Sequence, residues 1–246
     1  MNTSSYAVLY IINFKEITKM KKTLAMFLAS ALILVSAVTF TSCDDVTDND
    51  VYVTITNGNI VLAYEDVDLT DADSDGALTI NDVLYLVHEE KYTGGVAEGY
   101  ASENTQYGFS LMKLWGNDSG SYGYTVNNVS AMSLSDTVKP GDHIVAYVYT
   151  DLTAWSDTYC YFDKVEIDAK KNTEFTLTLT MNSYDAEWNP VSMPLEGAVI
   201  TVDGTATEYV TNSEGRVTLS LADDAVISAL SDTLTLVPPI CVVDID

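Results

Sequence analysis

The sequence predicts an α+β domain followed by an all-β domain. Apolar residues recur at helical spacing in one main segment, residues 79–92. Segments with strand-like alternation lie before and after it, which favours a helix on one face of a mixed sheet. Beyond residue 164, strand-like segments follow one another at roughly ten-residue spacing, as is typical of a β-sandwich.

The first region, residues 51–163, begins with a predicted hairpin. Residues 51–55 alternate as a half-buried strand, Asn57-Gly58 supplies a turn, and residues 60–63 form the partner strand. The helix is expected to begin at Thr79, with Asp82 completing a capping box. Three later strands are predicted at residues 107–114, 122–126 and 143–149.

The second region, residues 164–246, contains only predicted strands. Pro238-Pro239 excludes a central strand at that point because proline cannot donate to a ladder. The expected strands are residues 174–181, 198–202, 208–211, 217–221 and 234–237.

The charge balance excludes one class of partner. The chain has 36 Asp and Glu against 11 Lys and Arg, for a net charge of −25. Nucleic-acid binding depends on cationic contacts to phosphate, so a nucleic-acid partner is not expected. Such a surface attracts cations instead.

The N-terminal segment has the layout of a secretory signal. Lys21 and Lys22 precede an uncharged apolar run over residues 24–40, and small residues lead to Cys43. The end of the segment resembles a bacterial lipobox, which implies cleavage before Cys43, diacylglycerol on its sulfur and a membrane-anchored place in the cell envelope. A transmembrane anchor and an ordinary signal peptide are the alternatives. Residues 1–42 are thus predicted as leader and signal, with Met20 a good start, and residues 43–50 as a tether.

One segment carries a metal-site pattern, Asp71-Ala72-Asp73-Ser74-Asp75-Gly76-Ala77-Leu78-Thr79-Ile80-Asn81-Asp82. Carboxylates at positions 1, 3, 5 and 12 can surround Ca²⁺, which takes six to eight oxygen ligands, and the glycine at position 6 allows the sharp bend. Leu78 is expected to anchor the loop in the core. The predicted ligands are Asp71, Asp73, Asp75, the Ala77 carbonyl, Thr79 and Asp82.

This loop resembles the EF-hand loop, with Asp at position 12 as in dockerin-type loops. Dockerins contain two such loops, whereas this chain has one, and residues 64–70 make a poor entering helix. The resemblance therefore implies structural calcium rather than a sensor or a cohesin-binding module.

The first region also resembles the transcobalamin-C-terminal-like domain of unknown function. The likeness rests on residues 107–111, on the strand Gly123-Tyr124-Thr125-Val126-Asn127, and on the turn within residues 138–144. It implies a β-grasp-like sheet with one main helix and the calcium loop just before that helix. The second region is similar to prealbumin-like or Ig-like surface modules over residues 194–202 and 211–215.

Other residues gave weaker signals. Trp115 and Trp155 lie beside polar turn residues and are possible ligand-binding residues. Cys160 and Cys241 could form a disulfide or remain buried thiols. No nucleophile motif, P-loop or dinucleotide-binding glycine pattern occurs, so an enzyme is not expected.

The leading hypothesis is an exported, calcium-binding lipoprotein that acts as a non-enzymatic surface binding module, with a surface protein as a possible partner. One alternative is capture of a small ligand, a corrinoid or a glycan, by the first domain. Another is an accessory subunit of a polysaccharide-degrading assembly.

Overall fold

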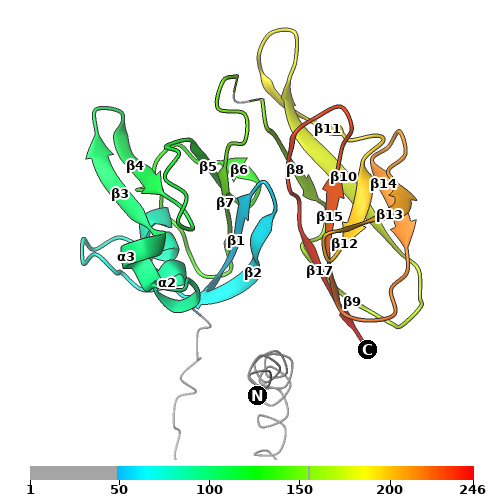
Figure 1. Ribbon diagram of the computed structural model, residues 1–246, viewed down its shortest axis with the longest axis horizontal. Coiled ribbons are helices and arrows are strands. Elements are labelled where there is room, and N and C mark those ends of the chain that lie inside the picture. Colours follow the sequence, from blue (N-terminus) through cyan, green and yellow to red (C-terminus); the bar gives the residue numbers. More distant parts are fainter. Residues whose placement is uncertain (1–48, 155) are drawn as a thin grey trace, which may run out of the picture. The chain divides into compact units, whose positions relative to one another are not determined.

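The computed structural model describes residues 49–154 and 156–246 and shows a predominantly β protein (Figure 1). The predicted signal segment, Cys43, most of the predicted tether and Trp155 lie outside the described residues. No helix of the described part is long and apolar enough to cross a membrane.

The first sheet has five strands in the order β2-β1-β7-β5-β6. β1 and β2 form the predicted hairpin, and β7 pairs in parallel with β1 although most of the domain separates them in sequence. The remaining pairs are antiparallel. The strands are β1 (Asp50–Asn57), β2 (Ile60–Asp68), β5 (Tyr122–Val126), β6 (Val129–Ser130) and β7 (His143–Val148).

Helix α2 (Ile80–Lys91) is the long helix of the described residues, and its N-terminus agrees with the prediction. Thr79 is the N-cap, and the Thr79 and Asp82 side chains each accept from the other's backbone N–H. Val83, Leu84 and Val87 are fully buried and pack in one core with strands of the first sheet. The helical spacing of these three residues therefore reports the face that the sheet covers.

A short helix and a hairpin that the sequence did not predict in full follow α2. α3 (Gly95–Gly99) follows closely after α2, with Gly94 at its N-cap in a left-handed conformation. β3 (Ala101–Thr105) pairs with β4 (Gly108–Lys113) as a separate two-stranded sheet. Leu111 of β4 and Leu114, which follows the strand, are buried in the core of the first domain.

The second domain contains two five-stranded sheets, whereas the sequence predicted five strands in total. One has the order β11-β10-β8-β16, with β14 also paired to β10, and the other has the order β13-β12-β15-β17-β9. The strands of the first are β8 (Thr158–Phe162), β10 (Phe175–Tyr184), β11 (Pro190–Pro194), β14 (Arg216–Leu219) and β16 (Leu236–Val237). Those of the second are β9 (Glu166–Ala169), β12 (Val199–Val202), β13 (Thr205–Val210), β15 (Ala225–Leu230) and β17 (Cys241–Ile245).

Strand β8 lies within the predicted first region, residues 51–163, but pairs with strands of the predicted second region. β8 pairs with β10 and β16, so it belongs to the second domain. The sequence does not reveal this because β8 follows β7 as one more apolar run. Pro238-Pro239 separates β16 from β17, as expected.

Each domain has its own core, and a small third cluster joins them. Leu177, Leu179 and Ile200 are fully buried in the second core. The third cluster includes Tyr147 of β7 and Tyr159 of β8. The two domains therefore share apolar contacts. Both lie within one compact unit, Thr47–Asp246.

Candidate metal centre

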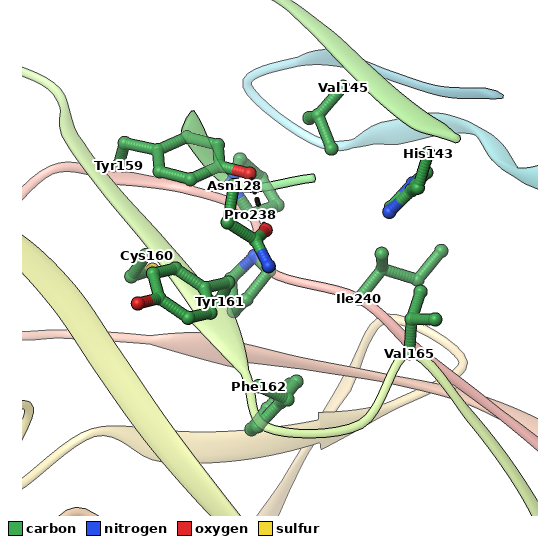
Figure 2. A pocket seen from close by; sticks show the side chains of 11 residues that line it. Asn128, His143, Val145, Tyr159, Cys160, Tyr161, Phe162, Val165, Pro238 and Ile240 are labelled. Atoms are coloured by element: carbon green, nitrogen blue, oxygen red, sulfur yellow. Dashed lines mark hydrogen bonds between the residues drawn. The ribbon is translucent and has the colours of Figure 1, made fainter. Parts of the chain in front are cut away.

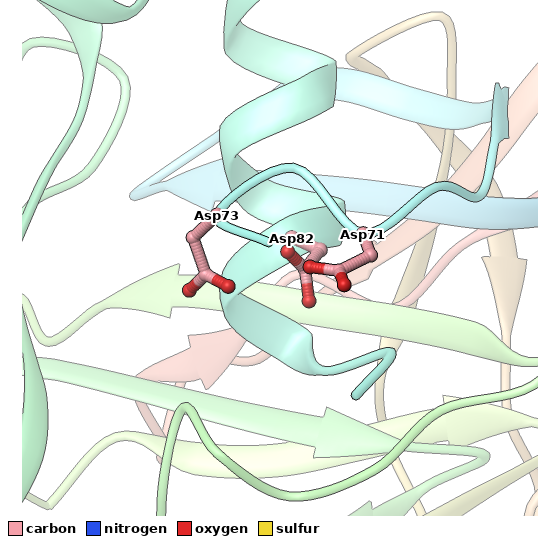
Figure 3. A group of neighbouring side chains, drawn as sticks. All are labelled: Asp71, Asp73 and Asp82. Atoms are coloured by element: carbon pink, nitrogen blue, oxygen red, sulfur yellow. The ribbon is translucent and has the colours of Figure 1, made fainter. Parts of the chain in front are cut away.

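The loop before α2 brings three carboxylates together. Asp71, Asp73 and Asp82 each place one oxygen within 4.8 Å of the others' (Figure 3). Asp71 and Asp73 come from the loop, whereas Asp82 comes from the first turn of α2. The spacing of positions 1, 3 and 12 thus folds into a convergent oxygen cluster, as the sequence predicts.

Backbone N–H groups shape the loop around these carboxylates. Asp71 accepts from the N–H groups of Asp75 at 3.1 Å and Gly76 at 2.9 Å. Gly76 has a φ of +88°, a left-handed conformation that favours glycine. The loop is therefore bent at the position that the motif reserves for glycine.

Asp82 anchors both ends of the loop. Its Oδ1 accepts from Ala72 N at 2.9 Å, and its Oδ2 accepts from Thr79 N at 2.9 Å and from Thr79 Oγ1 at 2.7 Å. The Asp82 side chain is completely buried. Burying an ionised carboxylate is costly unless opposite charge compensates it.

Among the described residues, no ion pair supplies that compensation. In residues 49–154 and 156–246, the ion pairs join Lys91 to Glu65 and Glu90, and Arg216 to Glu214. Burial and the neighbouring carboxylates of Asp82 and Asp75 raise the pKa of Asp73. The cluster is therefore an electrostatically unfavourable arrangement that a bound cation would relieve.

Two other predicted ligands, Asp75 and Thr79, do not belong to the group of three converging carboxylates. Asp75 is outside the group of three, and its Oδ1 accepts from Ala77 N at 2.8 Å. The Thr79 hydroxyl is used by the helix cap, where it donates to Asp82 and accepts from the Asp82 N–H at 3.4 Å. Leu78 packs against the core, as expected of the loop's apolar anchor.

Asn81 joins the cluster to the rest of the domain, and the sequence analysis missed it. Its Nδ2 donates to Asp73 Oδ2 at 3.1 Å, while its Oδ1 accepts from Tyr100 Oη at 2.7 Å and Ser102 Oγ at 3.0 Å. The sequence carries no local signal for this role, because Tyr100 and Ser102 come from a later part of the chain. The side chain orients Asp73 and connects the loop to the start of β3.

Substituting Asp73 with Asn should stabilise the protein without calcium and weaken its stabilisation by calcium. Its raised pKa shows that the ionised form is disfavoured in the metal-free protein. Asp73→Asn should therefore raise the melting temperature in excess chelator and shrink the gain in melting temperature that calcium gives. Thermal unfolding of both proteins in both buffers checks this, and a variant less stable than wild type in chelator would contradict it.

Trp115 packs inside the first domain rather than standing free. Its backbone N–H donates to His88 Nε2 at 3.0 Å, and its ring meets Tyr92 edge-on with centroids 5.0 Å apart. His88 is fully buried, and its Nδ1 donates to Leu84 O at 2.6 Å. The partly buried Trp115 ring is thus committed to an internal aromatic cluster.

Two cavities lie away from the acidic loop. One cavity of about 30 Å³ lies where the two domains meet, with His143 on one side and Asn128 and Tyr159 on the other (Figure 2). That volume suits one or two water molecules. A larger cleft of about 380 Å³ lies beside the β1–β2 turn, and its one carboxylate, Asp203, accepts from Val226 N.

Cys160 and Cys241 are free thiols in the structure, so the disulfide alternative is not realised. Both are buried in the second core. Burial raises the pKa of Cys241 to about 12 and that of Cys160 still further, which keeps both thiols protonated and unreactive.

Comparison with known proteins gives no family. No family model and no curated protein matches the chain. Two crystal structures of the four N-terminal Ig domains of Dscam1, isoforms 4.44 and 9.44, are similar at 9% and 10% identity. Each match covers 59% of this chain and 32% of the other, with a TM-score of 0.24, which is too low to support an argument.

Proposed function

We propose that the protein is an exported lipoprotein whose first domain is stabilised by Ca²⁺ and whose two domains serve non-enzymatic binding at the cell surface. The observation that carries the metal assignment is the convergence of Asp71, Asp73 and fully buried Asp82, none of which takes part in an ion pair within residues 49–154 and 156–246. A divalent cation supplies the charge that this arrangement lacks.

The donor set favours Ca²⁺ over other metals. All donors are oxygens, which suits hard cations and argues against zinc, for which thiolate and imidazole ligands are common. Ca²⁺ accepts irregular, many-ligand geometries, whereas Mg²⁺ demands near-ideal octahedral ones. We assign Asp71, Asp73 and Asp82 as the principal ligands, and keep Asp75, the Ala77 carbonyl and Thr79 as further predicted ligands.

The topology supports the β-grasp proposal for the first domain. A hairpin, a helix and a strand parallel to the first strand follow in that order, and β7 lies beside β1 in the sheet. We propose the transcobalamin-C-terminal-like relationship on this order and on the sequence motifs together. The prealbumin-like or Ig-like assignment of the second domain, which suggests display or spacing, is likewise a proposal.

Melting experiments test the metal assignment. Excess Ca²⁺ should raise the melting temperature of the chelated protein by about 5–10 °C if calcium is at about 100 times its dissociation constant, because binding to the folded state alone stabilises it by about 2.7 kcal/mol. Mg²⁺ at the same concentration should give a smaller shift. Identical melting curves in calcium and in chelator would contradict the assignment.

Cys43→Ser should move the protein from the membrane fraction to the soluble fraction. The proposed diacylglycerol on the Cys43 sulfur has two acyl chains, which anchor a protein far more stably than one chain does, and Cys43→Ser removes both. Fractionation of cells expressing wild type and variant, with metabolic labelling by a fatty acid, checks this. Persistent membrane association of unlabelled Cys43→Ser would contradict the lipobox interpretation.

The alternatives have less support. Capture of a corrinoid or a glycan at Trp115 conflicts with the packing of that ring against Tyr92, and Trp155 lies outside the described residues. The accessory role in a polysaccharide-degrading assembly gains no support from the loop, because dockerins contain two such loops and this chain has one.

A further inference from the structure

An exposed aromatic pair lies at the tip of the β10–β11 hairpin. Trp188 is 81% exposed and Tyr184 is 64% exposed. Their ring centroids are 6.1 Å apart and the ring planes are tilted by 45°. Apart from Trp155, which is outside the described residues, Trp188 is the tryptophan with the largest share of its surface open to solvent.

The tip is held in one conformation by Asp185. Its Oδ1 accepts from Glu187 N at 2.9 Å and Asn189 N at 2.8 Å, and its Oδ2 accepts from Asn189 Nδ2 at 3.0 Å. Trp188 N donates to Asp185 O at 3.1 Å. Hydrogen bonds from Asn189 lower the pKa of the Asp185 carboxyl, so it stays ionised at neutral pH.

Trp188 is a poor residue for its place in the fold. Its φ is +64°, a left-handed conformation that glycine and asparagine adopt more readily than a bulky residue. Little of its side chain is buried in return. A strained and exposed aromatic residue of this kind indicates a contact made outside the chain.

The charge around the pair selects the kind of partner. Residues 184–190 contain Asp185 and Glu187 but no Lys or Arg, and the whole chain has a net charge of −25. Anionic membranes, nucleic acids and acidic glycans are repelled by such a surface. A cation is attracted by both the carboxylates and the faces of the tryptophan and tyrosine rings.

We propose that the tip of the β10–β11 hairpin, residues 184–189, docks a cationic, arginine-bearing segment of a partner protein, with the guanidinium stacked on Trp188 and its charge balanced by Glu187. Arginine suits this surface better than lysine because its planar, weakly hydrated group stacks on aromatic faces. The inference rests on the proposed role as a binding module but not on the calcium loop.

The test follows the indole N–H signals of the full, calcium-loaded chain in ¹H–¹⁵N NMR spectra. The probe is a capped Gly-Arg-Gly-Arg-Gly peptide, with the same peptide carrying neutral citrulline in place of arginine as its control. The arginine peptide should shift the Trp188 signal, with weaker binding at higher salt. No shift, or an equal shift with the citrulline peptide, would overturn the proposal.

Trp188→Ala separates stacking from general attraction, because it leaves the net charge unchanged. Binding of the arginine peptide, followed by calorimetry, should weaken at least about tenfold. Unchanged affinity would show non-specific attraction to an acidic protein and would overturn the proposal. Binding of a neutral hexasaccharide that depends on Trp188 while the arginine peptide does not bind would also overturn it.

Trp188→Asn serves as the matched folding control. Asparagine tolerates the left-handed conformation, so the melting temperature should stay the same or rise while peptide binding is lost. Its calcium-dependent melting shift should equal that of wild type, so failure of the calcium assignment and failure of the docking surface can be told apart. A clear fall in the melting temperature would show that Trp188 serves the fold and would count against the proposal.

Discussion

Asp82→Asn should destabilise the metal-free protein by about 2–4 kcal/mol and abolish its response to calcium. The Asp82 carboxylate accepts three hydrogen bonds from Ala72 and Thr79 and is fully buried. An amide can accept with only one of its two ends. Its NH₂ group would therefore oppose either the Ala72 N–H or the two Thr79 donors. Chemical denaturation with and without calcium measures both effects.

Asp71→Asn is the matched control, because Asp71 lies in the loop and takes no part in the helix cap. It should also lose the calcium response but should cost less stability in chelator than Asp82→Asn. If Asp82→Asn kept the full calcium-dependent stabilisation, the assignment of this carboxylate as a ligand would be wrong.

Lowering the pH from 7 to 4 in calcium-free buffer should destabilise the first domain through its buried imidazoles. Burial lowers the pKa of His88 and of His143 to about 4, from a usual value near 6.5. His88 Nε2 accepts from Trp115 N, so protonation there replaces an acceptor with a donor. In the unfolded chain the imidazole is exposed to water and can be protonated near its usual pKa of about 6.5.

The direction in which stability changes with pH follows from proton binding by the two states. Between pH 6.5 and 4 the unfolded state binds the proton at position 88 more readily than the folded state, so stability falls as the pH falls and levels off below about pH 4. The full effect of His88 is about 3 kcal/mol. The difference between wild type and His88→Gln, measured by urea unfolding across this range, isolates it. An equal pH dependence in both proteins would contradict the prediction.

Local signals predicted the bend of the acidic loop and the start of its helix, while calcium binding itself stays a prediction. The loop spacing, the turn at Gly76 and the Thr79–Asp82 capping box depend on residues close in sequence, and the structure confirms the bend and the cap. The convergence of Asp71, Asp73 and Asp82 follows from the same spacing.

Long-range and exposure-dependent features could not be predicted in this way. The pairing of β8 with β10 and β16 depends on partners distant in the chain. Asn81 is recognisable as a link only because Tyr100 and Ser102 approach it from another element. The exposure of Trp188, which the sequence analysis did not single out, and the packing of Trp115 both depend on tertiary contacts.

Isothermal titration calorimetry of Ca²⁺ into the chelator-treated, dialysed protein tests the central proposal most directly. The proposal predicts one saturable site per chain that disappears in Asp71→Asn and is unaffected in Trp188→Asn. The absence of a saturable heat in the wild-type protein at millimolar Ca²⁺ would contradict it.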